Sequence, residues 1–272
     1  MKNVIIRSLS GIIYVALIVF CTLFGDYWFL GLTLLLGIGG MYELFILVDN
    51  DSEIKRHPFI FYLDMVAGIL IIVAPQACIL FGIAAPCSLL SLYLPIRLIV
   101  ELYTKDENPA KALGTSFFAL SYIAVPLAML NFLEILSLNN LILATFILIW
   151  LSDTGAFCVG SLIGKRRLFP RISPKKSWEG FLGGMIFCIA ASFVMIYCFP
   201  NYFTIKPELM IAIGVFVPVA ATYGDLVESM LKRSAGVKDS GSIMPGHGGF
   251  LDRTDSLLLV VPVVFILNLI IQ

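Results

Sequence analysis

Long apolar stretches alternate with short polar segments along the whole chain. A helix needs about 20 mainly apolar residues to cross the hydrocarbon core of a bilayer. The sequence holds nine stretches of roughly this length, which we predict to be transmembrane helices over residues 9–25, 27–48, 59–75, 77–100, 112–131, 138–159, 180–199, 207–224 and 254–271. The predicted fold class is therefore an all-α polytopic integral membrane protein.

The composition supports a membrane protein and excludes several other classes. The 272 residues are 60% hydrophobic and 13% charged, whereas a soluble domain is roughly 45–50% apolar and about 25% charged. A soluble enzyme and a disordered or fibrous protein are both excluded. Eighteen basic and eighteen acidic residues cancel, so we expect no nucleic-acid partner. The six cysteines have no CxxC spacing, and we expect them to serve packing rather than metal or redox chemistry.

The basic residues predict the orientation in the membrane. If the N-terminus is cytoplasmic and a turn at Pro75-Gln76 separates the third and fourth helices, Lys206 is the only one of the eighteen Lys and Arg residues outside. Cytoplasmic loops collect Lys and Arg. We therefore predict a cytoplasmic N-terminus, a C-terminus on the opposite side, and an active site on the cytoplasmic face of the inner (cytoplasmic) membrane.

Neither an internal repeat nor a low-complexity linker divides the chain, so we expect a single membrane domain over residues 1–272. Residues 1–135 are predicted to be generic N-terminal membrane helices. Residues 138–272 hold the candidate catalytic half, with two long cytoplasmic loops at 160–179 and 225–253. Both loops are rich in Gly, Pro, Ser, Lys, Arg and Asp.

The second of these loops carries acids and bases at close spacing. If the preceding helix continues past the membrane surface, Asp225, Glu228 and Lys232 share one face. Taken alone, this stretch is explained by a solvated helix end with a Glu228–Lys232 ion pair. Further on, three glycines surround His247, so the backbone can approach a ligand closely. Carboxylates and cations together suit Mg²⁺ bound to a nucleotide polyphosphate. The candidate metal ligands are Asp225, Asp252, Asp239, Asp255 and Asp153.

The first loop carries a candidate phosphate site. Asp153 lies near the cytoplasmic end of an apolar span, where an acid is a functional candidate. Ser173-Pro174 predicts a helix start with Ser173 as N-cap, and Lys175 and Lys176 beside it would complete a phosphate cradle. A loop that contacts anionic lipid headgroups would explain the other basic residues.

These residues resemble a known family. Ser229-x-x-Lys232-Arg233, Lys238-Asp239-x-Gly241 and Pro245-x-His247-Gly248-Gly249-x-x-Asp252-Arg253-x-Asp255 are similar to the signature of phosphatidate cytidylyltransferases, also called CDP-diacylglycerol synthases. The segments 173–180 and 153–164 resemble two further regions of the same family. The resemblance covers about the last 120 residues, and the first half matches only as a run of membrane helices.

The resemblance implies that CTP and phosphatidate give CDP-diacylglycerol and pyrophosphate, with Mg²⁺ and room for a second cation. The partners are then CTP, the lipid and the membrane, and a homodimer is left open. The family's metal-binding acids correspond to Asp225 and Asp252, and we add Lys238 as a catalytic candidate. The expected substrate-binding residues are Ser173, Lys175, Lys176, Ser177, Lys232, Arg233, His247, Gly248, Gly249 and Arg253.

Two other functions fit parts of the pattern. A lipid or polyprenol kinase that uses CTP would need a similar set of acids and bases. A secondary transporter would use the intramembrane acids Glu43, Asp64 and Asp153. Transporter sites lie near the bilayer midplane, often between repeats, whereas most charges here lie at one face.

Overall fold

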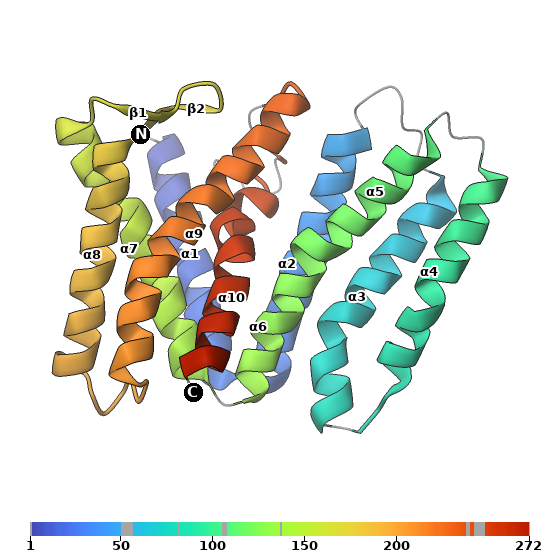
Figure 1. Cartoon of the computed structure of the whole chain (residues 1–272), viewed down its shortest axis with the longest axis horizontal. Helices are drawn as coiled ribbons and strands as arrows, with labels where there is room; N and C mark the ends of the chain where they lie inside the picture. The colour runs from blue at the N-terminus through green and yellow to red at the C-terminus, as the bar shows by residue number, and fades with distance from the viewer. Residues whose placement is uncertain are drawn as a thin grey trace. The chain divides into compact units, whose positions relative to one another are not determined.

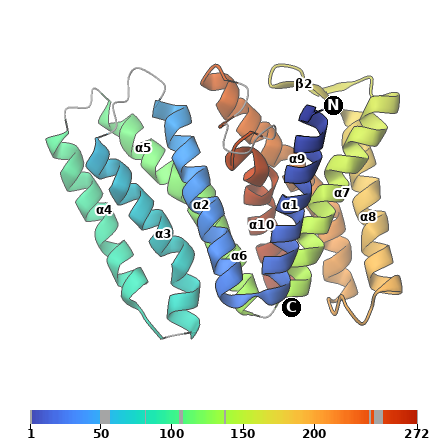
Figure 2. The same cartoon turned by 180° about the vertical axis from the view of Figure 1, so that it is seen from behind.

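The chain is built almost entirely of helices (Figures 1 and 2). The structure is a computed structural model that describes residues 2–49, 57–80, 82–104, 108–136, 138–237, 240–241 and 248–271; residues 2–10, 26, 49, 80 and 139 are described by their backbone alone. The helices are α1 (Lys2–Phe24), α2 (Asp26–Asp49), α3 (Pro58–Leu80), α4 (Ala85–Tyr103), α5 (Pro109–Ala119), the π-helix η1 (Leu120–Ala124), α6 (Val125–Ile135), α7 (Asn139–Ile163), α8 (Trp178–Cys198), α9 (Pro207–Ser234) and α10 (Leu251–Ile271), with two strands, β1 (Arg167–Phe169) and β2 (Ser173–Ser177).

The predicted fold class is confirmed. In the part of the chain that the structure describes, eight helical segments are long and apolar enough to cross a membrane, and Gly11–Phe24 is a shorter apolar helix. Together they correspond to the nine predicted stretches. The segment Pro109–Ile135 counts as one span because α5, η1 and α6 follow one another without a break.

A proline explains the π-helical turn inside that span. Pro126 is in the first turn of α6, directly after η1. Proline has no N–H, and its ring clashes with the carbonyl four residues earlier, which here belongs to Tyr122 of η1. A single π-turn widens the helix at this point, so the span continues through the proline.

The predicted turn at Pro75-Gln76 is wrong, because Pro75 lies inside α3 and the helix ends only at Leu80. Membrane helices tolerate proline where neighbouring helices satisfy backbone groups. One turn before the proline, the buried Asn131 side chain of α6 donates a hydrogen bond to the Ile72 carbonyl at 3.0 Å. A neighbouring helix thus binds the backbone of α3 close to the proline, at the carbonyl next to the one that loses its N–H partner.

The elements form two compact units, each of which is described by itself. Unit 1 comprises residues 1–137 and 234–254, and unit 2 comprises residues 138–233 and 255–272. In unit 1, α3 packs against α2, α4 and α6. Residues 234–254 group with the N-terminal helices in this division. The predicted division into 1–135 and 138–272 stays a prediction. A single domain over residues 1–272 stays a prediction.

In unit 2, α7 and α8 pack very closely because α8 carries glycines where the helices meet. A Cβ at Gly184 would lie 2.7 Å from the Ser152 carbonyl oxygen, and one at Gly180 would lie 2.8 Å from that of Ala156. Small residues let membrane helices approach to backbone contact. This contact fixes the end of α7 and the start of α8, from which the site is built.

An antiparallel hairpin of β1 and β2 stands where a helix was predicted to begin. The assignment of Ser173 as N-cap is wrong, since Ser173 and Pro174 belong to strand β2 and α8 begins at Trp178. The cap is Ser177, whose Oγ accepts a hydrogen bond from the Gly180 N–H at 3.1 Å. Strand pairing occupies the backbone that a helix start at residue 173 would have needed.

We expect Ser177→Ala to destabilise the protein by about 1 kcal/mol, because it removes a buried N-cap hydroxyl. Thermal unfolding in detergent measures the change, and Ser177→Thr, which keeps a hydroxyl, should restore most of it. An alanine variant as stable as the wild type would show that the cap contributes nothing.

Candidate active site

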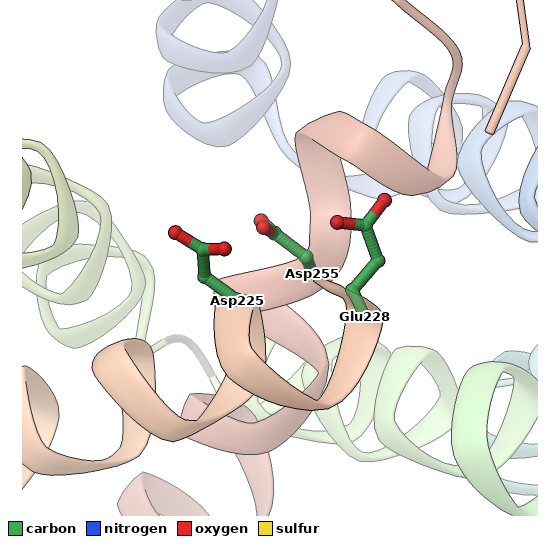
Figure 3. Close-up of side chains that lie close together, drawn as sticks. All are labelled: Asp225, Glu228 and Asp255. Atoms are coloured by element: carbon green, nitrogen blue, oxygen red, sulfur yellow. The ribbon is translucent and has the colours of Figure 1, made fainter. Parts of the chain in front are cut away.

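Three carboxylates of unit 2 meet where α9 and α10 pack together. Asp225 and Glu228 come from α9 and Asp255 from α10, and one oxygen of each lies within 4.8 Å of the others. Figure 3 shows the three side chains projecting into the same space. Glu228 is buried, with 1% of its surface exposed. Carboxylates this close repel one another unless cations neutralise them.

A glycine brings the two helices together at this point. A Cβ at Gly224 would lie 2.5 Å from the Asp255 carbonyl oxygen and 2.9 Å from the Cα of Ser256. The Ser256 hydroxyl donates a hydrogen bond to the Ala221 carbonyl of α9 at 3.2 Å. The backbones of α9 and α10 are therefore in contact directly beside Asp225 and Asp255, which sets the spacing of the acids.

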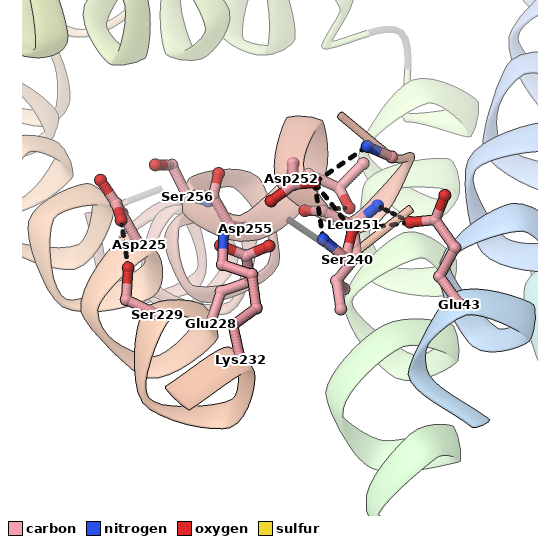
Figure 4. A network of polar contacts seen from close by, with 12 residues as sticks. Glu43, Asp225, Glu228, Ser229, Lys232, Ser240, Leu251, Asp252, Asp255 and Ser256 are labelled. Atoms are coloured by element: carbon pink, nitrogen blue, oxygen red, sulfur yellow. Dashed lines mark hydrogen bonds and ion pairs between the residues drawn. The ribbon is translucent and has the colours of Figure 1, made fainter. Parts of the chain in front are cut away.

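Two lysines form ion pairs with carboxylates of this cluster. Lys176 of β2 lies 2.7 Å from Asp225 Oδ2, and Lys232 lies 2.5 Å from Glu228 Oε2. The Ser229 hydroxyl also donates to Asp225 Oδ1 at 3.1 Å (Figure 4). Among the described residues, two ammonium groups thus contact a cluster of three carboxylates. Hard oxygen ligands fit a divalent cation such as Mg²⁺.

A cavity of about 550 Å³ opens beside Asp225 in unit 2. Its wall combines apolar rings with cationic side chains, which suits a ligand that has both apolar and phosphate parts. The predicted residues Asp153, Lys175, Lys176 and Ser177 all line it. The other lining residues are Ala156, Phe157, Gly160, Ser161, Arg167, Leu168, Gly180, Phe181, Thr222 and Asp225.

Asp252 lies on α10 one turn before Asp255, and its carboxylate accepts hydrogen bonds from Ser240 and Gly249 of unit 1. Its Oδ2 is 3.0 Å from the Ser240 N–H, 2.9 Å from the Ser240 hydroxyl and 2.9 Å from the Gly249 N–H (Figure 4). Gly248 has φ +81°, and a Cβ there would collide with the Asp252 carboxylate. The glycines thus let the backbone at residues 248–249 lie directly against this carboxylate. The assignment of Asp252 as a metal ligand beside Asp225 stays a prediction.

The remaining predicted residues lie in several places. Lys238, Asp239 and His247 are outside the residues that the structure describes. Arg233 lies in the last turn of α9, and Ser173 begins β2. The carbonyl of Arg253 accepts a hydrogen bond from the Tyr14 hydroxyl at 3.0 Å. Their roles as substrate-binding residues stay predictions.

The family model of the cytidylyltransferases matches residues 5–271 of the chain. The chain belongs to the cytidylyltransferase family. It is 36% identical over 202 residues to "Phosphatidate cytidylyltransferase" of Staphylococcus aureus (strain COL), a match that covers 74% of this chain and 76% of that protein. It is 39% identical over 202 residues to the protein of that name from Staphylococcus saprophyticus, with the same coverage. The protein of that name from Haemophilus influenzae is 45% identical over 124 residues, 45% of this chain and 43% of that protein.

The predicted family resemblance is therefore confirmed, and it extends to the first half of this cytidylyltransferase. Two of the acids that suggested a transporter, Glu43 and Asp64, have hydrogen-bond partners in unit 1. Asp64 is fully buried and accepts hydrogen bonds from the hydroxyls of Tyr93 (2.8 Å) and Ser116 (2.5 Å). Arg97, also fully buried, lies 3.7 Å from Asp64. This network joins α3, α4 and α5 through charges and hydroxyls.

Two acids of the site region were not predicted from the sequence. The sequence pattern places Glu228 on one helical face with Asp225 and Lys232, but Glu228 was not among the candidate metal ligands, although its i,i+3 spacing from Asp225 was a signal that both could hold one ion. Glu179, in the first turn of α8, accepts hydrogen bonds from the Lys165 and Arg166 N–H groups at 3.1–3.2 Å. It holds the backbone just before β1 and thereby the start of the hairpin that carries Lys176.

Proposed function

We propose that the chain is a membrane nucleotidyltransferase that converts CTP and phosphatidate to CDP-diacylglycerol and pyrophosphate in phospholipid biosynthesis. The match of residues 5–271 to the cytidylyltransferase family, together with relatives named phosphatidate cytidylyltransferase, carries this proposal. The lysine-bound acidic cluster beside a mixed apolar and cationic cavity supports it, because nucleotidyl transfer needs phosphates to be positioned and their charge neutralised.

The reaction needs no covalent enzyme intermediate. A phosphate oxygen of phosphatidate forms a bond to the α-phosphorus of CTP, and the bond from that phosphorus to the oxygen bridging the β-phosphorus breaks. The electron pair leaves with pyrophosphate. The protein's task is to hold the two phosphates in line, which makes an effectively unimolecular step of a bimolecular one.

We assign Asp225, Glu228 and Asp255 as the residues that hold Mg²⁺. The donor set is all oxygen, one oxygen of each acid lies within 4.8 Å of the others, and three carboxylates stand against two lysines among the described contacts. When bound, the ion would neutralise charge on the reacting phosphate and on the leaving pyrophosphate. Ser229 orients the Asp225 carboxylate through its hydroxyl. A second cation, and Asp153, Asp239 and Asp252 as ligands, are part of the same proposal.

The cationic wall of the cavity binds phosphate in this proposal. Arg167 and Lys175 line it, and Lys176 spans from it to Asp225 and to the Thr222 carbonyl. Phe157 and Phe181 line the same cavity and offer an apolar surface to acyl chains or to the cytosine ring. A lysine that already contacts the acidic cluster places phosphate next to it.

We further propose that the site faces the cytoplasm from the inner (cytoplasmic) membrane. Sixteen of the eighteen Lys and Arg residues lie in cytoplasmic segments of the predicted topology, Arg97 lies near the inner end of a span, and only Lys206 lies outside. This placement supports the orientation, since cytoplasmic loops collect Lys and Arg. Phosphatidate keeps its acyl chains in the bilayer while CTP is delivered from the cytosol. A site at the cytoplasmic ends of helices lets both substrates reach it.

Labelled CTP tests the reaction on the purified protein in vesicles that contain phosphatidate and Mg²⁺. Label in the α-phosphate of CTP should enter the lipid, and label in the γ-phosphate should appear in pyrophosphate. Vesicles of phosphatidylcholine alone are the control and should give neither product. Entry of the γ label into lipid would identify a kinase instead and refute the proposal.

A further inference from the structure

Glu43 is a buried acid in a membrane-spanning helix, and the proposed reaction gives it no role. It lies in α2, six residues before the helix end at Asp49, with 2% of its surface exposed. A carboxylate in such a place is costly unless its oxygens are well bonded. A buried acid that persists in an apolar span is a functional candidate, so its partners matter.

The partners of Glu43 are the N-terminus of α10 and a serine. The Phe250 N–H donates to Oε1 at 2.9 Å, and the Leu251 N–H and the Ser240 hydroxyl lie 2.9 Å from Oε2 (Figure 4). The first N–H groups of a helix have no partner within it and form its positive end. Glu43 supplies that missing cap from a residue 207 positions earlier in the chain.

Ser240 connects Glu43 to Asp252. Its hydroxyl lies 2.9 Å from Glu43 Oε2 and also 2.9 Å from Asp252 Oδ2, while its N–H donates to Asp252 at 3.0 Å. A serine hydroxyl has one proton, so it donates to only one of the two carboxylates at a time. The two acids therefore share one donor, and the position of each depends on the other.

Glycines make the space for Glu43. A Cβ at Gly241 or at Gly249 would collide with the Glu43 carboxylate, and a Cβ at Gly39 of α2 would collide with the Phe250 ring. Gly249 is one of the three glycines around His247 that predict room for a ligand, but it instead lies against a carboxylate of the protein's own membrane helix, as Gly241 does.

We propose that Glu43 is a positioning residue that holds Ser240 and the start of α10, and through them orients the Asp252 carboxylate for the reaction. The proposal rests on the proposed function for what Asp252 does, but the anchoring itself lies wholly in unit 1. It predicts a local change at residues 250–252 when Glu43 is altered, together with a loss of turnover.

The first test is amide hydrogen exchange of Glu43→Gln in lipid nanodiscs, without CTP or metal. Glutamine keeps one acceptor oxygen and places an NH₂ group where the other stood, so one of the two α10 amides loses its partner. We expect exchange at Phe250 or Leu251 to become about 10-fold faster or more. Asp64→Asn, which changes another fully buried acid of unit 1, is the matched control and should leave these two amides unchanged. Unchanged exchange in Glu43→Gln would overturn the proposal.

Turnover is the second readout. Glu43→Gln should lower kcat about 10-fold or more, because small displacements of reacting groups are costly, while the KM for CTP changes much less. Faster exchange at residues 250–251 with wild-type kcat would overturn the positioning role. If the wild-type protein makes no CDP-diacylglycerol, the proposed function fails, and the exchange result still decides whether Glu43 anchors α10.

A double-mutant cycle provides a second test of the contact if Glu43→Gln folds poorly. Gly241→Ala places a methyl group against the Glu43 carboxylate, so by itself it should speed exchange at residues 250–251. In a Glu43→Ala background the same methyl group has no carboxylate to meet and should add little. Contacting residues give such non-additive effects, whereas independent ones add. Additive effects of the two substitutions would refute the contact.

Discussion

Asp225→Asn should lower the rate of CDP-diacylglycerol formation by about 100-fold or more, the scale seen when one preorganised electrostatic group is removed from an active site. Asp225 belongs to the three-carboxylate group and also contacts Lys176 and Ser229. The amide has nearly the same shape but no charge, so it weakens cation binding and leaves Lys176 without its anionic partner. Incorporation of α-labelled CTP into lipid, measured across a Mg²⁺ titration, gives both kcat and the metal requirement.

Glu208→Gln is the matched control, because Glu208 is an exposed acid in the first turn of the same helix. It should keep wild-type turnover and Mg²⁺ dependence. Binding of Mn²⁺, followed by its electron paramagnetic resonance signal without CTP, gives a readout independent of activity. Asp225→Asn should weaken that binding. Wild-type turnover or wild-type Mn²⁺ affinity in Asp225→Asn would exclude this acid as a metal ligand.

The membrane helices were predictable because their signal is local. A run of apolar residues reports a span wherever it occurs, and the spans agree with the structure to within several residues at most ends. The predictions were wrong where contacts with other segments override the preference of the local sequence. Pro75 suggested a turn, but α3 continues through it beside Asn131 of α6. Ser173-Pro174 suggested a helix start, but β1 pairs with that segment.

The candidate site was predictable in its parts and less so in its arrangement. Helical spacing placed Asp225, Glu228 and Lys232 on one face, and the Glu228–Lys232 ion pair confirms it. The meeting of Asp225 with Asp255 depends on the register between α9 and α10, which Gly224 sets and no local pattern reports.

Glu43 is a second residue whose role depends on contacts that the sequence pattern does not report. As an isolated acid in an apolar span it suggested a transporter, because its partners lie 197 to 208 positions away in the sequence. Contacts between residues this far apart in the chain cannot be predicted from their spacing in the sequence. The glycines near those partners were noted, but their reason, the carboxylate of Glu43, is visible only in three dimensions.

Gly224→Ala should both destabilise the protein and lower its activity. The added methyl group would lie 2.5 Å from the Asp255 carbonyl oxygen and 2.9 Å from the Cα of Ser256. Both are backbone atoms that cannot rotate aside, so α9 and α10 must separate. Overpacking of this kind costs about 1–3 kcal/mol, although alanine by itself favours a helix over glycine by about 1 kcal/mol. Separation of the helices also moves Asp225 away from Asp255, so we expect kcat to fall more than the loss of folded protein explains.

Gly114→Ala separates the steric effect from the change in helix propensity. Gly114 lies in α5, and a Cβ there would meet no atom within 4 Å. This variant should be as stable as the wild type or more so, with unchanged turnover. Thermal unfolding in detergent and label incorporation, compared for both variants, decide the matter. A Gly224→Ala protein with wild-type stability and kcat would mean that backbone contact between α9 and α10 does not set the spacing of Asp225 and Asp255.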